Sequence, residues 1–97
     1  MAYNFLCETT TEPHWKKLNT VLRKYDRLEV FPLLEASEGT YGLAVSVPMK
    51  NVGDSAYRQF VKVHRILTKR FKFTVYDLYY GTEVDREQIE VIRREIS

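Results

Sequence analysis

Residues 41–47, Tyr-Gly-Leu-Ala-Val-Ser-Val, alternate between large and small side chains at every position. Successive side chains of a β-strand point to opposite faces of the sheet, so the large residues share one face and the small residues share the other. A helix would not suit this pattern, because its apolar residues recur every three or four positions. The segment therefore predicts a strand that turns its large residues into a core and its small residues away from it.

The sequence on either side of this strand predicts three more strands and three helices. In the first half of the chain we expect a strand over 3–9, a helix that begins near Pro13 and ends near Asp26, and an edge strand over 28–36 that contains Pro32. A hairpin turn over 37–40 should join this edge strand to the strand over 41–47. In the second half we expect a helix over 54–72 capped by Asp54 or Ser55, a strand over 73–80, and a last helix that begins with a capping box over 85–88. Two helical crossovers that flank a hairpin are typical of the ferredoxin-like β-α-β-β-α-β sandwich. We expect this α+β fold, with a four-stranded antiparallel sheet, both long helices on one face and an extra C-terminal helix.

Length and composition favour a single domain. With 97 residues, of which 44% are hydrophobic, the chain can build one core but not two. We expect one domain over 1–97, with its core over about 2–80 and the C-terminal helix over about 85–97. No apolar run approaches the roughly 20 residues that cross a bilayer, the N-terminus does not resemble a secretion signal, and the single cysteine, Cys7, cannot form an internal disulfide. These features predict a cytoplasmic protein without a membrane segment.

The segment 39–45 resembles part of the third strand of the RNA-recognition motif, which shares this order of strands and helices. The resemblance implies a sheet face on which aromatic rings stack against bases. Leu43 stands where the motif has a stacking ring, and Glu38 replaces a cation. The small residues that would line the outer face cannot stack either, so we do not expect base stacking on this sheet.

The face of the predicted sheet that the long helices leave open, the open sheet face, should be apolar. An exposed apolar patch of this kind usually has a cover or a partner. We expect either the last helix, whose isoleucines need an apolar surface, or a second copy of the chain to lie on it. The residues expected on this face are Leu6, Phe31, Leu33, Ala44 and Tyr79, with Phe73 and Val75 beside them.

Cations concentrate on the two predicted long helices, and most strongly over 54–72, which has six Lys or Arg residues and one carboxylate, Asp54. Spacings of four and three place five of them on one outward side of the helix. Such a row is either a solvated surface or a surface for phosphate groups or an acidic partner. The five residues are Arg58, Lys62, Arg65, Lys69 and Lys72.

Residue patterns for catalysis are weak. His14, His64 and Cys7 have no paired spacing of the kind that metal sites use, and we expect neither a metal nor a cofactor. Asp77 lies among tyrosines and could act as an acid or base, but a polar residue on an exposed strand explains it equally well. We therefore expect a non-enzymatic binding module that contacts a protein partner or forms a homodimer. A nucleic-acid binder that uses the helix face is the alternative, and a small-molecule-sensing regulatory domain is the third.

Overall fold

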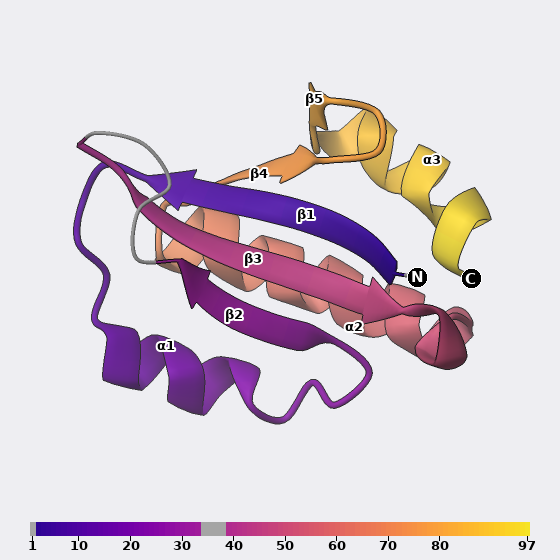
Figure 1. Cartoon of the computed structure of the whole chain (residues 1–97), viewed down its shortest axis with the longest axis horizontal. Helices are drawn as coiled ribbons and strands as arrows, with labels where there is room; N and C mark the ends of the chain where they lie inside the picture. The colour runs from indigo at the N-terminus through magenta and orange to yellow at the C-terminus, as the bar shows by residue number, and fades with distance from the viewer. Residues whose placement is uncertain (1, 34–38) are drawn as a thin grey trace.

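Five strands form one antiparallel sheet in the computed structural model of the chain, in the order β2-β3-β1-β4-β5 (Figure 1). The structure describes residues 2–33 and 39–97, so the predicted turn at Ser37 and Glu38 and the predicted end of the second strand lie outside the described residues. The elements are β1 (Ala2–Thr9), α1 (Trp15–Leu22), β2 (Glu29–Leu33), β3 (Tyr41–Pro48), the 3-10 turn η1 (Met49–Asn51), α2 (Asp54–Arg65), the π-helical segment η2 (Ile66–Arg70), β4 (Thr74–Asp77), β5 (Thr82–Glu83) and α3 (Arg86–Ile96).

The centre of the sheet is the long pairing of β1 with β3, which runs from Ala2 opposite Pro48 to Thr9 opposite Tyr41. β2 pairs with the other side of β3 and forms one edge, as Pro32 predicts for a residue that cannot donate to a sheet. β4 pairs with the other side of β1, and β5 forms the second edge. The chain is thus a compact α+β domain with three α-helices among the described residues.

One face of the sheet carries the core. The large residues of β3 and the odd-numbered residues of β1 point toward α2, which lies behind the sheet in Figure 1. The rings of Phe5 and Phe60 stack with their centroids 4.3 Å apart. The alternation in 41–47 therefore gave the correct inward face, since Leu43, Val45 and Val47 are buried. The radius of gyration, 12.4 Å, is close to the roughly 12.5 Å of a compact chain of this length.

The last helix packs beside α2 and not on the open sheet face. Ile92 and Ile96 of α3 are fully buried, and the guanidinium group of Arg93 lies 5.8 Å from the centre of the Tyr57 ring. The backbone N–H of Gly53, just before α2, donates a 2.7 Å hydrogen bond to the carbonyl of Ile96. Coverage of the open sheet face by the last helix is therefore wrong, because its isoleucines are already committed to the core beside α2.

The helix ends differ from the predicted ones. His14 caps α1, because its Nδ1 accepts from the backbone N–H of Lys17 at 3.2 Å, and α1 ends at Leu22 rather than near Asp26. Gly53 precedes α2, so neither Asp54 nor Ser55 is its cap. Asp85 caps α3 as predicted, since its Oδ1 accepts from the backbone N–H of Gln88 at 2.9 Å. Among the described helices, none combines the length and the hydrophobicity that crossing a bilayer requires.

The fourth strand is shorter than predicted and has the opposite facing. β4 ends at Asp77, and a turn leads from there to β5. Phe73 and Val75, which we expected beside the open sheet face, are buried on the helix side. Their facing follows from the register, because Val75 lies opposite the buried Cys7 of β1. Tyr76 takes their predicted place on the open sheet face.

Candidate functional site

Four side chains form a continuous apolar row across the open sheet face. The register sets Phe31 of β2 opposite Ala44 of β3, Ala44 opposite Leu6 of β1, and Leu6 opposite Tyr76 of β4. Phe31 is 49% exposed and Tyr76 is 37% exposed, while Leu6 and Ala44 between them are half-buried. These four residues, the apolar row, place an aromatic ring at each end of a hydrophobic strip about 14 Å long, three strand spacings.

The sheet carries carboxylates but no cations. None of the five described strands contains Lys or Arg. Glu83 lies opposite Tyr76 at the end of the apolar row, and Glu8 and Glu29 lie in the neighbouring rows. Carboxylates repel phosphate groups, so the open sheet face is unsuited to nucleic acid. Its charges suit an apolar partner surface that is bordered by Lys and Arg.

The structure brings most of the predicted open-face residues together. Leu6, Phe31 and Ala44 belong to the apolar row, and the half-buried Leu33 lies one row away, opposite Gly42. Tyr79 does not lie in a strand. It is in the turn after β4, and its ring is 5.9 Å from the ring of Tyr3, on the side of the sheet that Tyr3 shares with Phe5.

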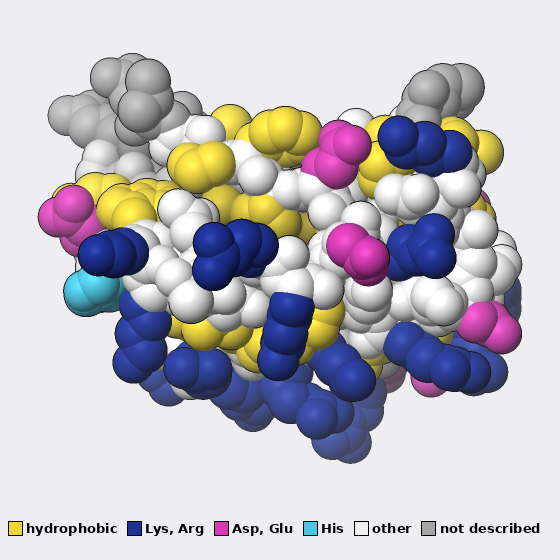
Figure 2. All heavy atoms as spheres, turned by 90° about the horizontal axis from the view of Figure 1, so that it is seen from below, with side chains coloured by type: hydrophobic (Ala, Val, Ile, Leu, Met, Phe, Trp, Pro, Cys, Tyr) yellow, Lys and Arg dark blue, Asp and Glu magenta, His cyan; other side chains and the backbone are white. Residues whose placement is uncertain are grey.

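Four of the five predicted cations lie along the outer side of α2 and η2. Arg58, Lys62, Arg65 and Lys69, the basic stripe, are all exposed. Among the residues that the structure describes, the single ion pair joins Arg93 to Glu90 at 3.9 Å, so no carboxylate there neutralises the basic stripe. Figure 2 shows Lys and Arg side chains crowded along the rim on the helix side, while hydrophobic side chains are prominent along the opposite rim.

Lys72 does not continue the basic stripe. The helix ends at Arg70, and Lys72 adopts a left-handed backbone conformation with φ of 59°. It lines a shallow hollow of about 220 Å³ together with Glu8, Thr74 and Tyr76. Lys72 therefore lies at the margin of the open sheet face. Its predicted place in the basic stripe assumed that the helix continues to residue 72, but the helix ends at Arg70.

Asp77 is fully buried and holds the turn after β4. Its Oδ2 accepts a 2.5 Å hydrogen bond from the hydroxyl of Tyr3, and its Oδ1 accepts from the backbone N–H groups of Tyr79 and Tyr80 at 2.8 and 3.2 Å. Gln88 of α3 donates to Oδ2 at 3.4 Å. Burial and the bond to Asp77 raise the pKa of Tyr3. The prediction that Asp77 lies on an exposed strand face is wrong, and its oxygens are occupied by structural donors.

The histidines and the cysteine have structural neighbours. Nε2 of His64 lies 2.7 Å from the carbonyl of Val84, and burial lowers the pKa of His64. Cys7 is fully buried in the core, and burial raises its pKa to about 12. Within residues 2–33 and 39–97, no group of three or more His, Cys, Asp or Glu side chains is placed to hold a metal ion.

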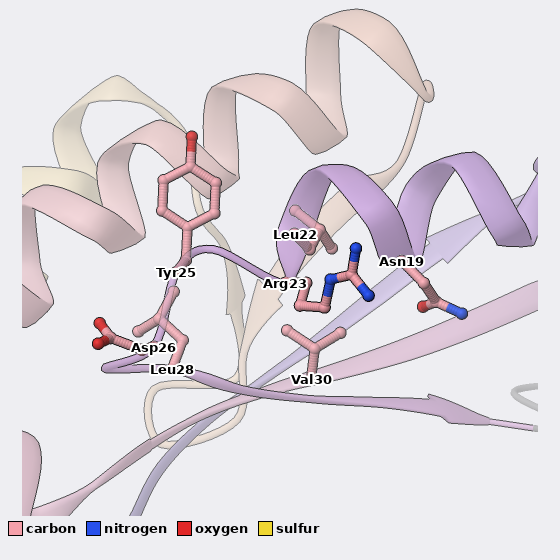
Figure 3. A pocket seen from close by; sticks show the side chains of 7 residues that line it. All are labelled: Asn19, Leu22, Arg23, Tyr25, Asp26, Leu28 and Val30. Carbon is pink, nitrogen blue, oxygen red and sulfur yellow. The ribbon is translucent and has the colours of Figure 1, made fainter.

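Two hollows beside α1 contain no converging acid and base. One, of about 290 Å³, is lined by polar side chains whose ends diverge in Figure 3: the amide of Asn19 and the carboxylate of Asp26 point away from each other, and the hydroxyl of Tyr25 points toward α2. Asp26 accepts a hydrogen bond from Gln59 at 3.0 Å, which lowers its pKa and ties this loop to α2. The other, of about 400 Å³, is mainly apolar around Trp15 and has one carboxylate, Glu12.

Sequence reasoning missed Tyr76 of the apolar row and Arg86, which lines a groove between α2 and the start of α3. The facing of β4 could have been found from Phe73 and Val75, because two large residues at period two before a polar turn favour the core side. Arg86 had no such signal, since its surroundings depend on how α3 packs against α2.

Comparisons with known proteins give no match for this chain, whether with protein-family models, with curated proteins or with solved structures.

Proposed function

We propose that this chain is a non-enzymatic binding module that contacts another protein through its open sheet face. The observation that carries the proposal is the apolar row, which runs unbroken across four strands and ends in two exposed aromatic rings. Aromatic side chains are enriched among the residues that dominate binding energy in protein interfaces. A flat surface with a hydrophobic centre and a polar margin is typical of such interfaces.

The charges around the apolar row favour a partner of a different kind over a second copy of the chain. In a symmetric dimer through this face, the carboxylates of both copies, Glu8 and Glu29 among them, would enter one interface without any Lys or Arg from the strands to offset them, and uncompensated like charges in an interface are unfavourable. A partner with an apolar centre and Lys or Arg at its margin would meet these carboxylates with opposite charge.

Selection from a random peptide library, followed by NMR titration of the selected peptides, tests this proposal. We expect enrichment of aromatic or aliphatic residues flanked by Lys or Arg, with chemical-shift changes in β1, β2, β3 and β4. Leu6→Arg should abolish binding, whereas Tyr79→Ala, which removes a more exposed aromatic side chain outside the row, should not weaken it. Shift changes confined to the helices, or equal losses in both variants, would contradict the proposal.

Self-association is the competing outcome, and light scattering over a range of protein concentrations distinguishes a homodimer from a monomer that binds a different partner. A monomer at all concentrations supports a different partner. A dimer that Leu6→Arg dissociates would assign the apolar row to a second copy of the chain.

A second candidate function is binding of nucleic acid through the basic stripe. The observation that favours it is the absence of a carboxylate partner for Arg58, Lys62, Arg65 and Lys69 in the described part of the chain. Duplex DNA should then bind with a logarithmic salt slope of roughly −0.9 per phosphate neutralised. Arg58→Gln with Lys62→Gln should reduce the affinity and flatten that slope, and undetectable binding of single-stranded and duplex oligonucleotides near physiological salt would remove this candidate.

We also propose that the domain is ferredoxin-like. The support is the strand order β2-β3-β1-β4 with antiparallel neighbours, together with α1 and α2 as the two crossovers. This architecture supports many unrelated functions and does not by itself select one. We further place the protein in the cytoplasm, a proposal that its one cysteine, buried and unpaired, supports.

A further inference from the structure

A groove of about 260 Å³ separates α2 and η2 from the start of α3, and cations form both of its walls. Arg65 and Lys69 stand on one wall and Arg86 on the other. All three side chains are exposed, and none belongs to the one ion pair of the described residues. The groove thus gathers three cations from elements that are distant in sequence.

The other lining residues add no negative charge. Val61 and Ile89 are half-buried and apolar, and the hydroxyl of Thr68 already donates to the carbonyl of His64 at 2.8 Å. No carboxylate lines the groove. Glu83, which lies outside the groove, favours the charged form of His64, but burial has the larger effect and lowers the pKa of His64. His64 also lines the groove, and its Nε2 lies 2.7 Å from the carbonyl of Val84. The charged hydrogen-bond donors that line the groove are the two guanidinium groups and the ammonium group.

We propose that this groove binds a phosphate dianion, either free or as the terminal phosphate of a small molecule. A phosphate monoester carries a charge of about −1.5 to −2 near neutral pH, and Arg pairs with its oxygens through two parallel hydrogen bonds. Three cations that line two walls of one small groove suit this compact charge better than a nucleic-acid backbone, whose phosphates each carry one charge and are spread along a chain. The volume is below the roughly 300 Å³ at which sites for drug-sized ligands begin, so the ligand should be small.

NMR titration at constant ionic strength tests the site, with inorganic phosphate, phenyl phosphate and the diester dimethyl phosphate as probes. We expect shift changes over 61–69 and 86–89 and saturation by the two dianions. Arg86→Gln should weaken binding about tenfold, because it removes a charge-assisted contact. Arg94→Gln is the matched control, since Arg94 is exposed on the same helix and does not line the groove, and its affinity should stay within about twofold of the wild type. Lys69→Gln and Lys62→Gln form a second pair of the same design.

Three results would overturn the site: equal weakening by Arg86→Gln and Arg94→Gln, binding of dimethyl phosphate as tight as that of phenyl phosphate, or no saturable binding of any probe. Equal affinity for inorganic phosphate and phenyl phosphate would assign the groove to the free ion, and tighter binding of phenyl phosphate to a phosphorylated small molecule. Far-UV circular dichroism of each variant confirms that the compared proteins are folded. The site is independent of the apolar row, so its failure leaves the proposed protein contact in place.

Discussion

The hydroxyl of Tyr3 donates a 2.5 Å hydrogen bond to Oδ2 of Asp77, which lies 74 positions later in the chain. This bond joins the first residues of β1 to the end of β4, and the other carboxylate oxygen holds the turn that follows. A buried carboxylate is stable only where donors surround it. The Tyr3–Asp77 hydrogen bond therefore stabilises the packing of the sheet against the turn after β4.

Replacing Asp77 by Ala should lower the free energy of unfolding by about 3 kcal/mol, because four partly buried hydrogen bonds lose their acceptor. Tyr3→Phe should cost less, about 1–2 kcal/mol, since it removes a single donor. Tyr80→Phe is the control, because its hydroxyl binds Glu95 at the surface, and it should leave stability nearly unchanged. Urea denaturation measures all three, and an effect of Tyr3→Phe as small as that of Tyr80→Phe would contradict the assignment.

Ala44→Arg and Val45→Arg should have opposite outcomes although the residues are adjacent. Ala44 faces away from the helices, so an arginine there extends into solvent and should change the free energy of unfolding by less than about 1 kcal/mol. Val45 is 1% exposed on the core side, and an arginine there should prevent folding. Thermal melting of the two variants measures both effects on stability. A large loss of stability in Ala44→Arg at concentrations where the protein is monomeric would mean that something in the chain covers the open sheet face.

Stability should fall in alkali because of Cys7. Burial raises the pKa of Cys7 to about 12, whereas an unfolded thiol titrates near 8.5, so the unfolded chain loses its proton first. The contribution is fully present below about pH 8.5 and is lost as the pH rises toward 12. Between pH 7.5 and 9.5 it should cost about 1.4 kcal/mol. Cys7→Ala should remove this component, and wild-type and variant curves that stay parallel over this range would contradict it.

Lys72→Gly should raise the free energy of unfolding by about 0.5–1 kcal/mol. A residue with a Cβ atom is destabilised by roughly 1–2 kcal/mol in the left-handed region, and Lys72 has φ of 59°. Glycine removes this strain but loses more conformational entropy on folding, so the net gain is smaller. Lys69→Gly, within the π-helical segment, should instead lower it by about 1 kcal/mol. Denaturant titration of both variants gives the sign of each effect, and a loss of stability in Lys72→Gly would show that its side chain makes a contact worth more than the strain.

Local sequence patterns predicted the helices and strands of this chain better than they predicted the contacts between them. The alternation in β3 depends on neighbours in sequence, and it predicted the side of β3 that carries the buried Leu43, Val45 and Val47. Asp77 could not be placed in this way, because its burial depends on the hydroxyl of Tyr3 at the other end of the chain. The isoleucines of α3 predicted a buried side of that helix, but amphipathicity does not say which surface receives it. Lys72 was misplaced because helical spacing was extended past the end of the helix.

Lys and Arg are confined to the helices and loops, and the described strands contain carboxylates without cations, so the positive charge of the molecule lies away from its strands. Such an uneven distribution of charge orients a protein in the field of a polyanion, with its cations toward the anion before contact. Under the proposal that the basic stripe binds a polyanion, the apolar row would face away from that partner. The two proposed interfaces would in that case hold macromolecules of unlike charge on opposite sides of one small domain.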